Sequence, residues 1–285
     1  MQKFVKQIRK PFIKIKKKFL SVQAKFLETK AGKITATLTT YLAKFFETKI
    51  GKIVLVFISF ASYLLFVTWQ FSAVIIMMLY IHELGHIWAM KQQGMKAGGI
   101  YFIPFIGAAA SSGSDFPSHK AGVLVAIMGP VWGFALAIVF GGVYFLTKNP
   151  LYAIMASMTA IFNWFNLLPI YPFDGGRIVK SILSSIHWRS EIIFMVLSGI
   201  CLVVSGVLSL YHKDFLLALF FIVFGIIVLL ISLFWEKQEL PLLTFAEILI
   251  STVCYLVAMA IMLIFAMWIL NLLGTIEWTK IIRAY

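Results

Sequence analysis

The chain has 285 residues, of which 61% are hydrophobic and 13% are charged, and its mean hydropathy is +0.96. Soluble domains carry about 25% charged residues, so this composition excludes the soluble classes and indicates an all-α polytopic membrane protein. The formal net charge of +14 is concentrated near the N-terminus.

Residues 1–52 form a basic arm with 14 Lys or Arg residues and two acidic residues. Its Phe and Leu residues recur at helical spacing, which favours an amphipathic helix on an anionic lipid surface. A Lys-rich segment can also indicate nucleic-acid binding. Because the apolar periodicity runs directly into a hydrophobic segment, we expect lipid as the partner and no nucleic acid. The excess of Lys and Arg places this arm in the cytoplasm.

An internal repeat lies in this arm, where AKFLETKAGKI (24–34) recurs 19 residues later as AKFFETKIGKI (43–53) with nine of eleven positions identical. Two copies are too few for a solenoid. We interpret the repeat as a duplicated surface-helix element, and a local duplication without any role fits equally well.

The hydrophobic segments predict about six to seven transmembrane helices, since a crossing needs about 20 apolar residues. The candidate spans are residues 53–69, 71–90, 121–147, 151–169, 191–211, 215–235 and 243–272. The first two are separated by only a very short turn, so the number of spans stays open.

Residues 95–120, after the second span, lack helical patterning. Glycines and a proline punctuate the segment, and residues 100–106 are mostly aromatic or β-branched. This pattern predicts a short membrane-embedded β-hairpin or extended segment. Backbone at that depth needs protein partners for its polar groups.

The sequence HELGH (82–86) places two histidines and a glutamate in an otherwise apolar span. His82 and His86 are four residues apart, so both imidazoles project from one face of a helix and can bind one divalent metal. Glu83 can then accept a proton from a water that the metal activates. Each ionisable group at mid-membrane costs about 2.5–3.5 kcal/mol, so three in five residues imply a compensating partner.

A third ligand is expected from the sequence NLLPIYPFDGGR (166–177), whose prolines and glycines break the helix. Asp174 lies at the break and is the only acidic residue between Asp115 and Glu191. Alternation of the spans brings it to the same membrane face as HELGH. With Glu83 and two neutral imidazoles, it balances the charge of Zn²⁺. The other histidines are expected in a polar loop, at a helix end and on the outer side: His119, His187 and His212.

These two motifs together resemble the site-2 protease family of intramembrane zinc metalloproteases, in which HExxH precedes an Asn, Pro and Asp-Gly motif. The resemblance covers about residues 71–186. It implies zinc ligation by His82, His86 and Asp174, and general-base catalysis by Glu83. It also implies that Asn166 binds substrate or stabilises the transition state, although an amide that bridges two helices is an alternative. We interpret Asn163 as a packing amide.

Composition, hydropathy and the resemblance together divide the chain into three regions. Residues 1–52 are the basic amphipathic cytoplasmic arm, residues 53–186 the zinc metalloprotease transmembrane core, and residues 187–285 the C-terminal transmembrane helices. No segment is long enough for a PDZ domain within the core or for CBS modules after it, so we expect a compact member. Its expected location is a bacterial cell membrane, with the active site near the cytoplasmic side.

The function that follows is a zinc endopeptidase that cleaves membrane-anchored substrates in or near their transmembrane segments. The alternative is a multi-pass transporter that holds a metal with the same ligands. A scaffold without cleavage activity ranks last, since both halves of the site are present. A Glu83→Gln variant distinguishes the first two, because only a protease needs the base.

Overall fold

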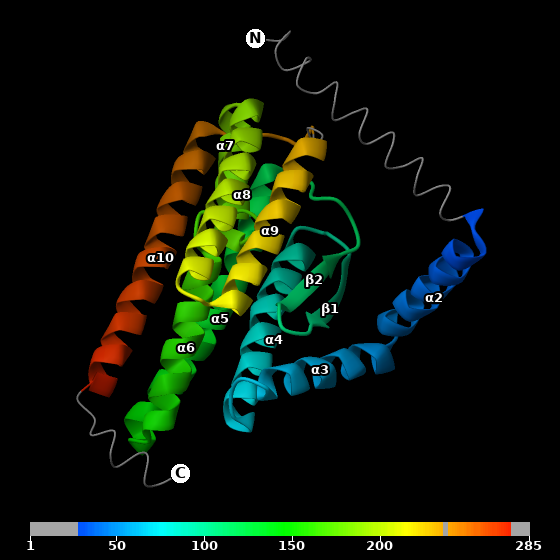
Figure 1. Ribbon diagram of the computed structural model, residues 1–285. Coiled ribbons are helices and arrows are strands. Elements are labelled where there is room, and N and C mark those ends of the chain that lie inside the picture. The colour runs from blue at the N-terminus through cyan, green and yellow to red at the C-terminus, as the bar shows by residue number, and fades with distance from the viewer. Residues whose placement is uncertain (1–27, 236–238, 275–285) are drawn as a thin grey trace. The chain divides into compact units, whose positions relative to one another are not determined.

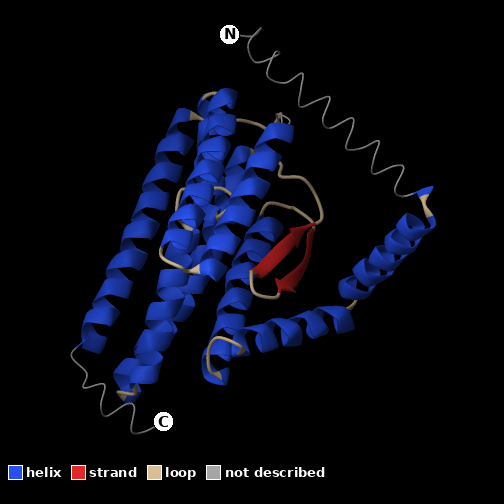
Figure 2. Ribbon diagram, viewed as in Figure 1, coloured by secondary structure: helices blue, strands red, loops and turns tan. Residues whose placement is uncertain are grey.

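The computed structural model describes residues 28–235 and 239–274. The chain divides into two compact units, residues 1–57 and 58–285. Figure 1 labels their helices and strands, and Figure 2 colours them by type.

The first unit contains α2 (Lys30–Glu47) and the beginning of α3 (Lys49–Leu64). Both helices begin immediately after the threonine of an ETK sequence, Thr29 in the first copy of the repeat and Thr48 in the second. Thr48 Oγ1 accepts a hydrogen bond from the Gly51 amide at 3.0 Å, as a residue at a helix start commonly does. Each copy of the repeat therefore marks a helix start.

The second unit is a helical bundle (Figure 1). In its first half, α5 packs against α4, α6 and α7; in its second half, α8 packs along α9, and α10 packs on α6. The bounds are α4 (Trp69–Gln92), α5 (His119–Thr147), α6 (Pro150–Asn166), α7 (Asp174–Ile186), α8 (Trp188–Tyr211), α9 (Phe215–Phe234) and α10 (Phe245–Gly274). The core between α5, α7 and α10 is apolar and includes Ile127, Ile178 and Met262.

Five helices in the described ranges are long and apolar enough to cross a membrane: α4, α5, α8, α9 and α10. The predicted spans at 53–69 and 151–169 correspond to α3, with 16 residues, and α6, with 17. Both are shorter than the roughly 20 residues that a perpendicular crossing needs. The all-α membrane fold is confirmed.

A two-stranded antiparallel sheet follows α4, as predicted. Strands β1 (Ala97–Ile103) and β2 (Gly107–Ser112) pair Ile100 with Ala110 and Phe102 with Ala108. Gly107 has φ of 145°, a conformation that only glycine adopts easily, and it ends the turn between the strands. The sheet lies along α4 (Figure 2), so its backbone is held close to HELGH.

The break between α6 and α7 fixes the position of Asp174, the first residue of α7. A Cβ atom on Gly175 would lie 2.0 Å from the Leu167 carbonyl oxygen, so the loop crosses directly over the first turn of α7. The same oxygen accepts a hydrogen bond from Tyr255 Oη of α10 at 2.6 Å. The predicted break with Asp174 at the helix start is therefore present.

Candidate metal centre and active site

Three potential ligand atoms converge between α4 and α7. His82 Nε2 lies 3.1 Å from His86 Nε2 and 3.0 Å from Asp174 Oδ2, and His86 Nε2 lies 3.3 Å from that oxygen. All three residues are buried. Ligands in a tetrahedral zinc site with bonds of about 2.0–2.1 Å lie about 3.3 Å apart, so the spacing fits a metal.

The Nδ1 atoms of both histidines, which face away from the three convergent ligand atoms, have oxygen partners. The Nδ1–H of His82 donates to Asn163 Oδ1 at 2.8 Å, and the Nδ1–H of His86 donates to the Val125 carbonyl at 2.7 Å. With protons on Nδ1, both Nε2 atoms present lone pairs to each other and to the Asp174 carboxylate. These lone pairs and the carboxylate repel one another unless a cation lies among them. The three groups therefore fit as ligands of a divalent metal.

Two glycines let α5 approach α4 closely enough for this arrangement. A Cβ on Gly129 would lie 2.3 Å from His86 Nε2 and 2.9 Å from His82 Nε2. A Cβ on Gly85, within HELGH, would lie 2.2 Å from the Met128 carbonyl oxygen. The two imidazoles therefore occupy space that a side chain on α5 would otherwise fill.

Glu83 is buried beside these ligands and is held by the hairpin. Its Oε2 accepts a hydrogen bond from the Ala110 amide of β2 at 2.6 Å. The carboxylate is thus fixed between α4 and β2, in the cavity that His82, His86 and Asp174 also line.

The cavity has a volume of about 590 Å³, and α4, β2 and α5 to α9 all contribute residues to its lining. Asn166 lies on its wall, and the Asn166 side-chain amide donates to the Phe162 carbonyl of its own helix at 3.1 Å. Asn166 is therefore at the cavity wall, with its side-chain amide bonded to its own helix.

A polar cluster lines another part of the cavity. Lys180 Nζ lies 3.3 Å from Glu191 Oε1 and 3.5 Å from the centre of the Trp235 ring. Burial lowers the pKa of the Lys180 ammonium, and the Glu191 carboxylate opposes that shift. Arg177 is half exposed, and its Nη1 lies 3.8 Å from Asp174 Oδ1.

The structure brings together the four residues on which the sequence prediction rests: His82, Glu83, His86 and Asp174. Their roles in binding and catalysis stay predictions. Asn163 was interpreted as a packing amide, but it contacts His82 directly. The signal for it is an amide in an apolar helix three residues before Asn166. His119, predicted in a polar loop, is instead the buried first residue of α5.

Comparisons with known proteins relate this chain to a peptidase family. The model of peptidase family M50 matches residues 70–150 and 148–211, which include HELGH and the Asp-Gly motif. A zinc metalloprotease of Methanocaldococcus jannaschii is 33% identical over 123 residues, which are 40% of this chain and 35% of that protein. The matched part is thus about a third of the relative's length.

A solved structure, the site-2 protease from Methanocaldococcus jannaschii, aligns with 69% of this chain and 92% of its own, at 21% identity and a TM-score of 0.45. Both motifs of the site-2 proteases lie within the residues that the family model matches. The chain therefore belongs to peptidase family M50, the site-2 protease family.

Proposed function

We propose that this integral membrane protein is a zinc-dependent endopeptidase that cleaves membrane-anchored proteins in or near their transmembrane segments. The observation that supports it most directly is the buried convergence of two imidazole nitrogens and one carboxylate oxygen beside Glu83. These groups line a cavity between helices long and apolar enough to cross a membrane.

Each residue has a defined role in this proposal. His82, His86 and Asp174 hold the metal, and zinc there supplies Lewis-acid chemistry to a water and to the scissile carbonyl. Glu83 takes the proton of the attacking water and delivers it to the leaving amide nitrogen. The carboxylates of Asp174 and Glu83 balance the two positive charges of the metal, which favours the site in a medium of low polarity. Asn166 at the cavity wall contacts the substrate backbone.

The hairpin offers an edge for an unwound substrate. The Ala110 amide points to Glu83, so Ala110 and, two residues away, Ala108 direct their backbone groups away from β1 and toward the active site. The sheet has two strands in the part of the chain that the structure describes, so no third strand of that part covers this edge. A substrate segment can add there as a strand, which supplies partners for its peptide groups.

A proline at Ala108 tests this edge. Ala108→Pro removes one outward N–H, and its ring obstructs an added strand, so cleavage is expected to fall about tenfold while zinc content is unchanged. Ile100→Pro is the matched control, because the Ile100 N–H points away from β2. Initial rates on a purified transmembrane substrate measure the effect. Equal loss in both variants would show damage to the hairpin instead of loss of a docking edge.

Glu83→Gln tests the proposed reaction. The variant keeps the size of the side chain but cannot accept a proton, so it is expected to retain zinc and lose cleavage by at least about 100-fold. Proteomics of membrane fractions should show single-pass proteins that accumulate uncut in cells with Glu83→Gln. The same variant distinguishes a protease from a transporter. Preserved metal flux in Glu83→Gln, with no uncut protein accumulating, would favour transport and contradict the proposal.

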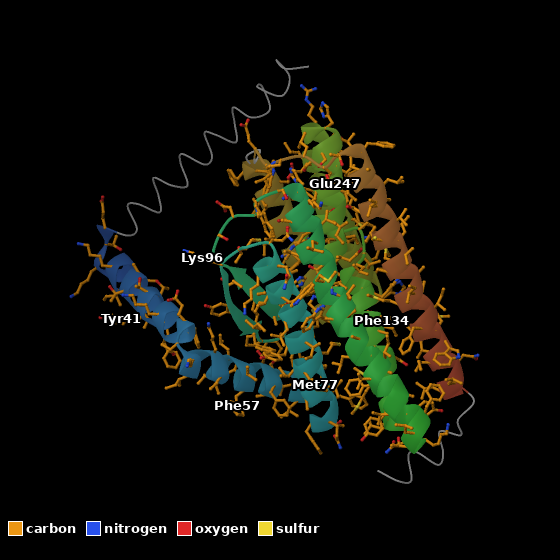
Figure 3. The ribbon with its side chains drawn as sticks, turned by 180° about the vertical axis from the view of Figure 1, so that it is seen from behind. Tyr41, Phe57, Met77, Lys96, Phe134 and Glu247 are labelled. Carbon is orange, nitrogen blue, oxygen red and sulfur yellow. The ribbon has the colours of Figure 1, made fainter. Side chains whose placement is uncertain are left out.

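We also propose that the basic arm lies on anionic lipid and that the active site is near the cytoplasmic side. On α2, four exposed apolar residues share one face: Ile34, Leu38, Tyr41 and Phe45. Figure 3 labels Tyr41 among the side chains that project from α2. Lys and Arg outnumber acids by 14 to two in residues 1–52, which complements anionic headgroups.

A fluorophore on α2 measures this contact. With Cys201 and Cys254 replaced by serine, a polarity-sensitive label at Tyr41→Cys is expected to shift to the blue in nanodiscs of anionic lipid and to lose that shift in neutral lipid. The control is Thr40→Cys, an exposed position across the helix. Identical spectra at the two positions would contradict a lipid-facing side.

A further inference from the structure

We infer that Asn163 is a positioning residue, which fixes the tautomer and orientation of His82 and thereby sets the affinity of the metal site. The inference deepens the proposed function and rests on it. It does not follow from the family motif, whose asparagine is Asn166, one turn further along α6.

The contacts of Asn163 determine which way its carboxamide faces. Its Nδ2 donates to the Thr159 carbonyl at 2.7 Å, an atom that can only accept. Its Oδ1 therefore faces His82 Nδ1 at 2.8 Å and requires a proton there. The lone pair of His82 is then on Nε2, the atom that lies with His86 Nε2 and Asp174 Oδ2. Asn163 has no exposed surface, so water does not replace it.

A slot on α5 holds the carboxamide in place. A Cβ on Gly133 would lie 2.1 Å from Asn163 Oδ1 and 2.4 Å from its Cγ. Gly129, one turn earlier on α5, similarly leaves space for the imidazoles. The backbone of α5 thus packs against both histidine rings and against the Asn163 carboxamide, which orients His82.

The two histidines differ in how their orientation can be tested. His86 donates to the backbone carbonyl of Val125, which no side-chain substitution removes. His82 donates to a side chain. Replacement of Asn163 therefore releases one ligand while the other stays fixed, and metal affinity reports the change directly.

The experiment measures zinc affinity of the full-length protein in detergent by competition with a chromophoric chelator. Asn163→Leu keeps the branched side-chain skeleton and its number of heavy atoms but has no acceptor, so its zinc affinity is expected to fall about 10- to 100-fold, the usual effect of losing such a partner. Asn163→Asp keeps the acceptor and is expected to recover most of that loss. Asn271→Leu, an exposed amide on α10, is the control and should match the wild type.

A double variant separates positioning from general damage. Gly133→Ala is expected to weaken zinc binding because its methyl group displaces the carboxamide. Once Asn163→Ala has emptied the slot, adding Gly133→Ala should cost nothing further, which is the non-additivity expected of residues in contact. Additive losses would contradict the slot.

Two results have different meanings. If the wild type binds zinc and Asn163→Leu binds it with the same affinity, the inference is overturned and the proposed function stands. If the wild type binds no zinc, the proposed function fails, and the positioning role fails with it.

Discussion

Asp174→Ala is expected to leave the protein folded but unable to retain zinc. The substitution removes the one carboxylate among three convergent ligands and leaves two imidazoles. Loss of a partner outside the ligand set already lowers metal affinity about 10- to 100-fold, so loss of a ligand should exceed about 100-fold. Zinc per protein, measured after dialysis against a weak chelator, gives the result.

Two further variants make this measurement specific. Asp174→Asn keeps the shape and removes the charge, so an intermediate affinity would show how much of the binding is electrostatic. Asp214→Ala changes an exposed acid beside α9 and should retain full zinc. Full zinc in Asp174→Ala would remove this residue from the ligand set.

Gly129→Ala is expected to abolish metal binding through a single methyl group. The added carbon would lie 2.3 Å from His86 Nε2, well inside van der Waals contact, and 2.9 Å from His82 Nε2. Both rings must move, and their anchors on α5 and α6 resist that movement. We expect zinc affinity to fall by at least about 100-fold, with the thermal midpoint lowered as well.

Gly142→Ala is a matched control on the same helix. A Cβ at Gly142 meets no atom within 4 Å, and alanine favours helix over glycine by about 1 kcal/mol. Gly142→Ala should therefore bind zinc normally. Equal zinc affinity in the two variants would contradict the steric account of Gly129.

The sequence predicted those parts of the site that depend on local spacing. The separation of four residues in HELGH puts His82 and His86 on one face of any helix, and the Pro and Gly residues after Asn166 force a break wherever that segment lies. Asp174 could be chosen because acids are so scarce in this part of the chain. The hairpin was predictable because glycines delimit an extended aromatic segment.

Other parts depend on how helices cross, which spacing does not determine. In the sequence, Asn163 looks like any amide that bridges two helices. Its contact with His82 follows only from the approach of α6 to α4. The need for Gly129 arises from rings on another helix. The polar cluster of Lys180 and Glu191 joins α7 to α8, and neither residue alone suggested a partner.

The anchors of the two imidazoles have a consequence for thermodynamic linkage. Through His82, His86, Asp174, Asn163 and Val125, the metal centre connects α4 with α5, α6 and α7. A ligand that binds only the folded form adds about 2.7 kcal/mol to its stability at 100 times its dissociation constant. In the proposed zinc form, the ion is therefore also a cross-link of the bundle, and chelation should loosen four helices at once.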